Sequence, residues 1–165
     1  MALSFWIFDR HTECLYHRDF VENTVNTRNS TDEAKLLLGM IHSLRSISHK
    51  LAPPNNDNLF DDSLQLASRN RVHTVETRNY TAHILQSLNG LLFVLIVANN
   101  EKKDNQQGQR QVNTSQTLET LKAFYRDVWT VSIPQNGMAR VSKNESIVIN
   151  DTRFTDNVDK LLRDL

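Results

Sequence analysis

The chain has few cysteines and glycines. Cys14 is the only cysteine, which excludes an internal disulfide and a multi-thiolate metal site and suits a reducing compartment such as the cytosol. The four glycines, Gly39, Gly90, Gly108 and Gly137, stand singly, and none belongs to a nucleotide-binding spacing. We therefore expect no cofactor and no nucleotide bound by this chain alone.

The sequence also lacks a charge excess and a long hydrophobic run. Nineteen basic residues balance nineteen acidic ones, so a charge-driven interface with nucleic acid or an anionic membrane is not expected. The most hydrophobic run, 91–98, is far shorter than the roughly 20 residues that span a bilayer. The apolar start, 2–8, breaks at Asp9-Arg10 without a basic leader, so it indicates a first strand and not a signal peptide.

Strand-forming patterns recur in two parts of the chain. Alternation and β-branched residues predict five strands, at 3–9, 13–20, 63–68, 71–87 and 91–98. The fourth is longer than a usual strand of about 5 or 6 residues, and an extra turn or a bulge near Arg78-Asn79 would divide it. Residues 147–149 are a further candidate for an edge strand.

Three segments have helical spacing. They run from a cap at Thr31-Asp32 to about residue 51, from a cap at Ser115 to about 131, and over 152–165. The polar stretch 99–114 cannot bury a face and is predicted to be a mobile linker. The order is strand, strand, helix, three strands, helix, helix, which predicts one α+β domain over 1–165 with an antiparallel sheet.

The first predicted helix is strongly apolar. Its stripe steps through Leu37, Ile41, Leu44 and Leu51, with Leu36, Met40 and Ile47 beside it. We expect a wide buried face and a core helix. Gly39 inside this pattern costs about 1 kcal/mol relative to Ala, so it indicates either local slack or the close approach of a second backbone.

No strong catalytic constellation is present. His42 and His49 share a helical face but lie about 10 Å apart along the axis, too far to hold one metal together. Asp32 and His42 are almost three turns apart, so a triad with Ser43 fails on geometry. We assign no catalytic residue and no metal ligand.

Several segments together resemble a known family. They are 4–10 (Ser-Phe-Trp-Ile-Phe-Asp-Arg), 34–47 (Ala-Lys-Leu-Leu-Leu-Gly-Met-Ile-His-Ser-Leu-Arg-Ser-Ile), Lys50-Leu51, 71–74 (Arg-Val-His-Thr) and 90–95 (Gly-Leu-Leu-Phe-Val-Leu). The chain resembles the small longin-like core subunits of the TRAPP vesicle-tethering complex, most closely the Bet-five or subunit-one type. This resemblance implies a longin-like (profilin-like, SNARE-like) domain with a five-stranded antiparallel sheet. Beyond residue 99 the resemblance is weaker.

The resemblance also implies a function. Such subunits assemble with the other small TRAPP core subunits, and the core acts as a guanine-nucleotide exchange factor for the Rab GTPase of ER-to-Golgi and early Golgi traffic. The chain would be a non-catalytic scaffold in the cytoplasm, peripheral at cis-Golgi and endoplasmic reticulum membranes and contacting them only through the complex. Exchange needs stronger binding of the nucleotide-free GTPase, and no acid, base or nucleophile.

Five residues of the first helix are our candidates for partner contact. Gly39 would allow close packing against a neighbouring subunit, and the polar side carries Lys35, His42, Arg45 and His49. The alternative is a small chain of a clathrin-type coat adaptor, which shares the order of elements and similar length. A longin-type fusion protein would need a following heptad helix, and a stand-alone enzyme on a profilin-like fold would need a catalytic site.

Overall fold

The computed structural model describes residues 1–21, 30–51, 72–99, 107–133, 149 and 151–162, with the backbone alone for residues 30 and 107–113. The chain divides into two compact units. The first consists of Met1–Thr27 and Thr74–Leu165, and the second is Arg28–His73. The expectation of a single domain stays a prediction.

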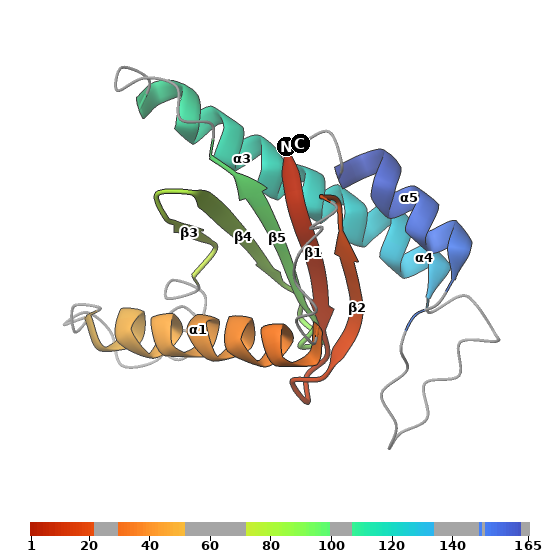
Figure 1. The fold of residues 1–165 in the computed structure, drawn as a ribbon, viewed down its shortest axis with the longest axis horizontal. Coiled ribbons are helices and arrows are strands. Elements are labelled where there is room, and N and C mark those ends of the chain that lie inside the picture. Colours follow the sequence, from red (N-terminus) through yellow and green to blue (C-terminus); the bar gives the residue numbers. More distant parts are fainter. Residues whose placement is uncertain (22–29, 52–71, 100–106, 134–148, 150, 163–165) are drawn as a thin grey trace, which may run out of the picture. The chain divides into compact units, whose positions relative to one another are not determined.

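The first unit is built on one antiparallel sheet (Figure 1). Its strands are β1 (Ala2–Phe8), β2 (Cys14–Asp19), β3 (Thr74–Glu76), β4 (Tyr80–Gln86) and β5 (Leu92–Ala98). They lie in the order β2-β1-β5-β4-β3, which places β1 and β5 side by side, although they are far apart in the sequence. The predicted α+β class with a five-stranded antiparallel sheet is therefore confirmed.

The long predicted strand 71–87 is two strands, β3 and β4. The turn between them is held at Thr77, whose backbone amide and hydroxyl both donate to the Tyr80 carbonyl oxygen, at 2.9 and 2.7 Å. Asn99, just beyond β5, donates its side-chain amide to the Thr77 carbonyl and accepts from the Thr81 hydroxyl, both at 2.7 Å. A turn therefore divides this segment, and a bulge does not. The predicted strand 63–68 lies outside the described residues.

The helices of this unit follow β5. They are α3 (Gln107–Phe124), the π-helical η1 (Tyr125–Trp129), α4 (Thr130–Ser132) and α5 (Thr152–Leu162). The prediction of a linker at 99–114 is wrong for residues 107–114, because these residues form the first turns of α3. Extending an existing helix fixes few dihedral angles for each hydrogen bond gained, so polar residues can continue a helix that packs further along. Ser115 therefore lies inside α3 and does not cap it.

The π-helical segment η1 interrupts this long helix where it meets the sheet. The amide of Thr130 donates to the carbonyl of Tyr125, five residues back, and the Thr130 hydroxyl donates to the carbonyl of Arg126. Within η1, Val128 and Trp129 are buried, while Arg126 and Asp127 are exposed and pair with each other at 2.7 Å. The wider turn thus places two large apolar side chains on the core side of the helix.

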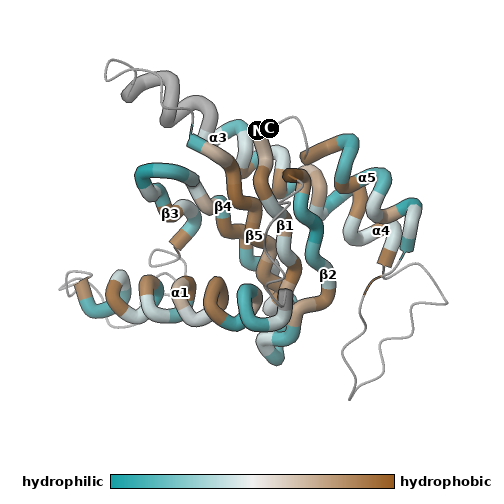
Figure 2. The backbone as a smooth tube through the Cα atoms, viewed as in Figure 1, coloured by the Kyte–Doolittle hydropathy of each residue, from teal (hydrophilic) through white to brown (hydrophobic). Residues whose placement is uncertain are grey.

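One face of the sheet forms a core with α3, η1 and α5. The central contacts are aromatic: Phe124 lies edge-on to Phe5 with ring centroids 5.3 Å apart, and Phe154 lies edge-on to Tyr16 at 5.0 Å. The apolar colouring of β1 and β5 marks the same centre in Figure 2. Buried members are Ala2, Phe5, Ile7, Tyr16, Phe93, Leu95, Leu121, Phe124, Val128, Trp129, Phe154, Val158 and Leu162. Such edge-to-face pairs contribute about 0.5–1.5 kcal/mol each beyond their area.

Polar contacts join β2 to α5 at the border of this core. Arg18 makes two hydrogen bonds to the carboxylate of Asp159, at 3.1 and 2.7 Å. The Tyr16 hydroxyl donates to the Thr155 hydroxyl at 3.3 Å. On the outer edge of β2, the Ile149 amide donates to the Leu15 carbonyl at 2.9 Å, while the other two residues of the predicted edge strand 147–149 lie outside the described residues.

The opposite face of the sheet is apolar too. Trp6 and Phe8 of β1 are buried and their rings stack, with centroids 6.2 Å apart. His17 of β2 stacks on Trp6 at 3.5 Å, and its Nε2 lies 2.9 Å from the Asp19 carboxylate. Trp129 is buried on the other face, so both tryptophans belong to the core.

Candidate partner-binding surface

The β1–β2 turn contains the Phe8-Asp9-Arg10 segment of the predicted motif. One carboxylate oxygen of Asp9 accepts hydrogen bonds from the amides of His11 and Glu13, both at 2.8 Å. The backbone of Asp9 makes two further hydrogen bonds within the turn. Its amide donates to the Glu13 carbonyl, and its carbonyl accepts from the Thr12 amide. Asp9 therefore holds the turn together, and its place in the motif has a structural cause.

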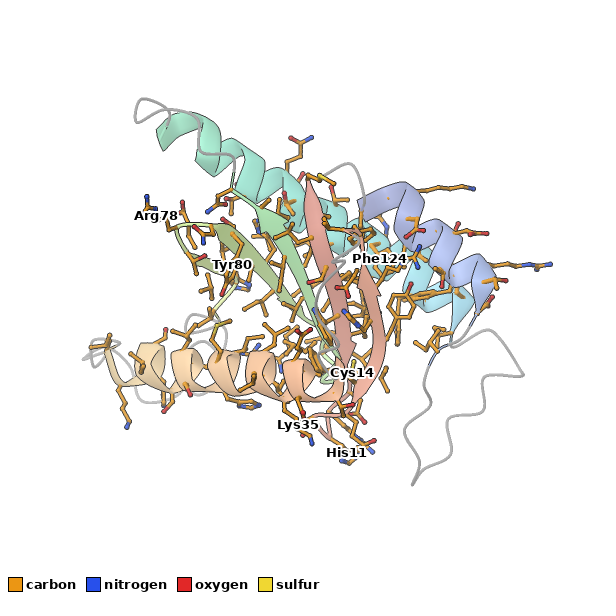
Figure 3. All side chains as sticks on the ribbon, viewed as in Figure 1. His11, Cys14, Lys35, Arg78, Tyr80 and Phe124 are labelled. Atoms are coloured by element: carbon orange, nitrogen blue, oxygen red, sulfur yellow. The ribbon has the colours of Figure 1, made fainter. Side chains whose placement is uncertain are left out.

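Gly90 brings the neighbouring β4–β5 turn against this one. It has a φ of +85°, and a β-carbon added to it would lie 2.9 Å from the Arg10 Cβ atom. The turn is closed by Ser87, whose hydroxyl accepts from the Leu91 amide at 3.1 Å. Leu88 at its tip is 95% exposed. Figure 3 marks His11 at the adjoining β1–β2 turn.

The five predicted partner residues all lie on α1 (Ser30–Leu51), the helix of the second unit. Lys35, His42 and His49 are exposed and follow one another at seven-residue steps, which places them along one side of the helix. Gly39 is exposed on the adjoining side. Arg45 is partly buried and lies one turn after the fully buried Ile41, so it is displaced from this exposed side.

The prediction that α1 has a wide buried face is wrong for three of its residues, which are exposed. Leu36 is 74% exposed, Ile47 52% and Leu51 77%, whereas Ala34 and Ile41 are buried. The apolar side chains extend over more of the circumference than one buried side of a helix can hold. That excess is visible in the sequence and predicts that some of these apolar residues are exposed, but it does not say which ones.

Gly39 lies beside these exposed apolar residues. A β-carbon placed on it would meet no heavy atom within 4 Å, apart from its chain neighbours and the backbone of its own helix. The sequence offered two explanations for Gly39, local slack or the close approach of a second backbone. Among the described residues, no second backbone lies close to it. One turn later the Ser43 hydroxyl donates to the Gly39 carbonyl at 2.9 Å, so this hydroxyl is already satisfied by its own helix.

The charge on α1 is arranged by position. Acidic side chains occur in its first turn, at Asp32 and Glu33, and basic ones in its last turn, at His49 and Lys50, which suits the helix dipole. Between residues 34 and 51 there is no aspartate or glutamate, while Lys35, Arg45 and Lys50 are present. Beyond its first turn, the helix therefore presents cationic and apolar groups without acidic ones.

Little in the described part of the chain favours chemistry on a substrate. No group of three or more His, Cys, Asp or Glu side chains within those residues is placed to hold a metal ion. Burial raises the pKa of the Cys14 thiol, which donates to the Tyr16 carbonyl at 3.5 Å. The thiol form is favoured, and it is a poor nucleophile. None of the described helices is long and apolar enough to cross a membrane.

The sequence matches one family model over almost its whole length. The Sybindin-like family model covers residues 2–164. A curated relative, the trafficking protein particle complex subunit BET5 of Saccharomyces cerevisiae, is 35% identical over an alignment of 99 residues, and the match covers 56% of this chain and 55% of the relative. The trafficking protein particle complex subunit 1 of Dictyostelium discoideum is 23% identical over 96 residues, 58% of this chain and 60% of the relative.

The matched part is a little over half the length of each curated relative. Among solved structures, Myxococcus xanthus MglB aligns with 74% of this chain and 85% of its own, at 10% identity and a TM-score of 0.38, too distant to support an argument. The family match covers both the strands and the closing helices. On that match, the chain belongs to the Sybindin-like family.

Proposed function

We propose that this chain is a structural subunit of a TRAPP-type vesicle-tethering complex and contributes to a composite guanine-nucleotide exchange surface. Two relatives that carry the name of trafficking protein particle complex subunits support the assembly role. The proposed GTPase is the Rab protein of ER-to-Golgi and early Golgi transport. The proposed location is cytoplasmic, peripheral at cis-Golgi and endoplasmic reticulum membranes.

The observation that carries this proposal is the exposed polar side of α1, on which Lys35 carries a positive charge. Lys35, His42 and His49 lie along one side of a helix that has no acidic residue between 34 and 51. Unlike charges across an interface raise the association rate and select the partner, so an acidic surface on a neighbouring subunit or on the GTPase suits this side. Gly39 adjoins this side, and the partly buried Arg45 completes the proposed contact set.

The role proposed for these residues is binding and not chemistry. An exchange factor accelerates nucleotide release because it binds the nucleotide-free GTPase more strongly than the nucleotide-bound form. A scaffold can supply part of that difference in binding free energy through surface contacts alone. The chain would therefore not be catalytic by itself.

The test is to tag the chain in its native cells and purify it at physiological salt. We expect the other small TRAPP subunits in stoichiometric amounts, in a complex that accelerates GDP release from the early-secretory Rab. Recovery of coat adaptor chains, or of this chain alone, would contradict the proposal. Purification at higher salt should reduce recovery of any partner held by the Lys35 charge, because added ions screen exposed charges.

A pair of charge reversals tests the residues themselves. Lys35→Glu on α1 should lower partner recovery or the exchange rate of the purified complex. Lys122→Glu makes the same change at an exposed lysine of α3 and serves as the matched control. Equal effects of the two variants would argue against the assignment of α1 as the contact surface.

A further inference from the structure

We propose that Asn89, in the β4–β5 turn, is a site of spontaneous deamidation, and that opening of this turn sets the rate. Asn89 is exposed and is followed directly by Gly90. Its neighbour Leu88 is 95% exposed, so solvent reaches the turn. The reaction needs only this chain and water, and it is therefore independent of the proposed function.

The reaction joins the side chain of Asn89 to the backbone nitrogen of Gly90. This nitrogen loses its proton and attacks the side-chain carbonyl carbon of Asn89, where a new C–N bond forms. The C–N bond of the side-chain amide breaks, and its nitrogen leaves as ammonia. Water then opens the resulting five-membered imide at one of its two carbonyl carbons. One opening gives aspartate, and the other gives isoaspartate, in which the main chain runs through the former side chain.

Glycine is the following residue that obstructs this attack least. It has no β-carbon to crowd the nitrogen, and it reaches more backbone conformations than other residues. The chain has a second Asn-Gly pair at 136–137, which lies outside the described residues. Asn79 offers an internal comparison, because it is exposed in the β3–β4 turn but is followed by Tyr80.

The closed β4–β5 turn holds the Gly90 nitrogen back from this attack. The Gly90 amide donates to the Ser87 carbonyl at 3.2 Å, and a proton held in this way is harder to lose. Two more hydrogen bonds close the turn. The Ser87 amide donates to the Leu91 carbonyl at 2.9 Å, and the Ser87 hydroxyl accepts from the Leu91 amide at 3.1 Å. Gly90 also lies against Arg10, which limits its movement while the turn is closed.

Opening the turn requires the loss of few contacts. Leu88 and Asn89 are both exposed, so the hydrogen bonds of Ser87 are the main interactions to be broken. Exposed turns are among the parts of a protein that open locally at a low cost in free energy. The rate in the folded protein is then the rate of the unfolded chain multiplied by the fraction of time for which the turn is open.

The two products should differ in stability. Aspartate keeps the backbone unchanged and adds one negative charge at an exposed position. Isoaspartate adds a methylene group to the main chain directly before Gly90, where a β-carbon on Gly90 would already lie 2.9 Å from the Arg10 Cβ atom. We expect the isoaspartate form to lose the turn and to unfold more readily than the aspartate form.

Mass spectrometry of the full chain tests the proposal. The folded protein and a sample unfolded in guanidinium chloride are kept at neutral pH, and the tryptic peptide 79–102 is followed over time. Fragment ions assign each amide-to-acid conversion to its asparagine. In the folded protein we expect conversion at Asn89 ahead of Asn79. In the unfolded sample Asn89 should react about tenfold faster or more, because three hydrogen bonds keep the turn closed most of the time.

Either of two results would overturn the proposal. Conversion at Asn89 that is absent, or no faster than at Asn79, would show that it is not a deamidation site. A rate at Asn89 in the folded protein equal to or above that in the unfolded sample would show that turn opening does not control the reaction.

A pair of variants tests the control by the turn. Ser87→Ala removes the hydroxyl that accepts from the Leu91 amide, and deamidation in the folded protein should become about two- to tenfold faster. Thr77→Ala is the matched control, because it removes a hydroxyl that closes the turn at the other end of β4 and should leave the rate at Asn89 unchanged. Equal rates in the two variants would overturn the assignment of Ser87.

Discussion

Gly90 and Arg10 lie so close together that a β-carbon on Gly90 would come within 2.9 Å of the Arg10 Cβ atom. The contact joins the β4–β5 turn to the β1–β2 turn, which are far apart in the sequence. The atom met is the first carbon of the Arg10 side chain, which cannot move without its backbone.

Replacement of Gly90 should therefore destabilise the protein. Gly90→Ala adds this clash to the strain of a positive φ, and we expect a loss of about 1–3 kcal/mol in the free energy of unfolding. Urea unfolding would measure it. Gly39→Ala is the matched control, because its β-carbon meets open space in a helix and should stabilise by up to about 1 kcal/mol. Similar effects of the two alanines would refute this account.

Asp9 should stabilise the fold through the two hydrogen bonds that its carboxylate accepts from backbone amides. Asp9→Ala leaves the amides of His11 and Glu13 without their carboxylate partner, and we expect a loss of about 1–2 kcal/mol. Asp9→Asn keeps a side-chain oxygen acceptor and should lose less. Thermal unfolding of both variants would show the difference, and equal losses would mean that the negative charge, and not the hydrogen bonds, is what matters.

The Arg18–Asp159 pair should couple β2 to α5 only modestly. The geometry is bidentate, but the two side chains are 43% and 25% exposed, so solvent screens the interaction. We expect a coupling free energy of about 0.5–1 kcal/mol from a double-mutant cycle of Arg18→Gln and Asp159→Asn, decreasing at high salt. A coupling of zero at low salt would show that the pair makes no net contribution.

His83 should make the fold sensitive to acid. Its side chain is 4% exposed, its Nδ1 atom has no hydrogen-bond partner among the described residues, and its cross-strand neighbours are Thr74 and Leu95. Burial lowers the pKa of His83 from its ordinary value of 6.5. The unfolded chain therefore binds this proton more readily, so stability is fully present above pH 6.5 and falls as the pH drops below it.

A variant separates His83 from the other histidines. His83→Leu removes the titrating group, and its free energy of unfolding should decrease less than that of the unaltered protein between about pH 7.5 and about pH 5.5. Urea titrations at the two pH values give the comparison. A decrease of the same size in both proteins would mean that His83 does not carry the acid sensitivity.

Local pattern predicted many of the elements because their causes are local. The hairpin of β1 and β2 and the helix α1 follow from alternation and from helical spacing, and both occur close to their predicted bounds. The bounds of β3 and α3 were less predictable. The turn before β4 depends on Asn99, 22 residues after Thr77, and the start of α3 depends on packing further along the helix.

The candidate surface was predicted in part. The polar positions Lys35, His42 and His49 are exposed, but Arg45 is partly buried, and the exposed apolar residues Leu36 and Ile47 were assigned to the core. Helical spacing tells how the apolar residues are distributed around a helix. It does not tell which part of that circumference is exposed.

By itself, the sequence determined the hairpin, the apolar helix, the two closing helical segments and the family resemblance, because each depends on spacing within a short stretch. Only the tertiary structure decided the sheet order β2-β1-β5-β4-β3 and the contact of Gly90 with Arg10. These depend on contacts between residues distant along the chain, and local periodicity carries no information about which distant residue covers a given side chain.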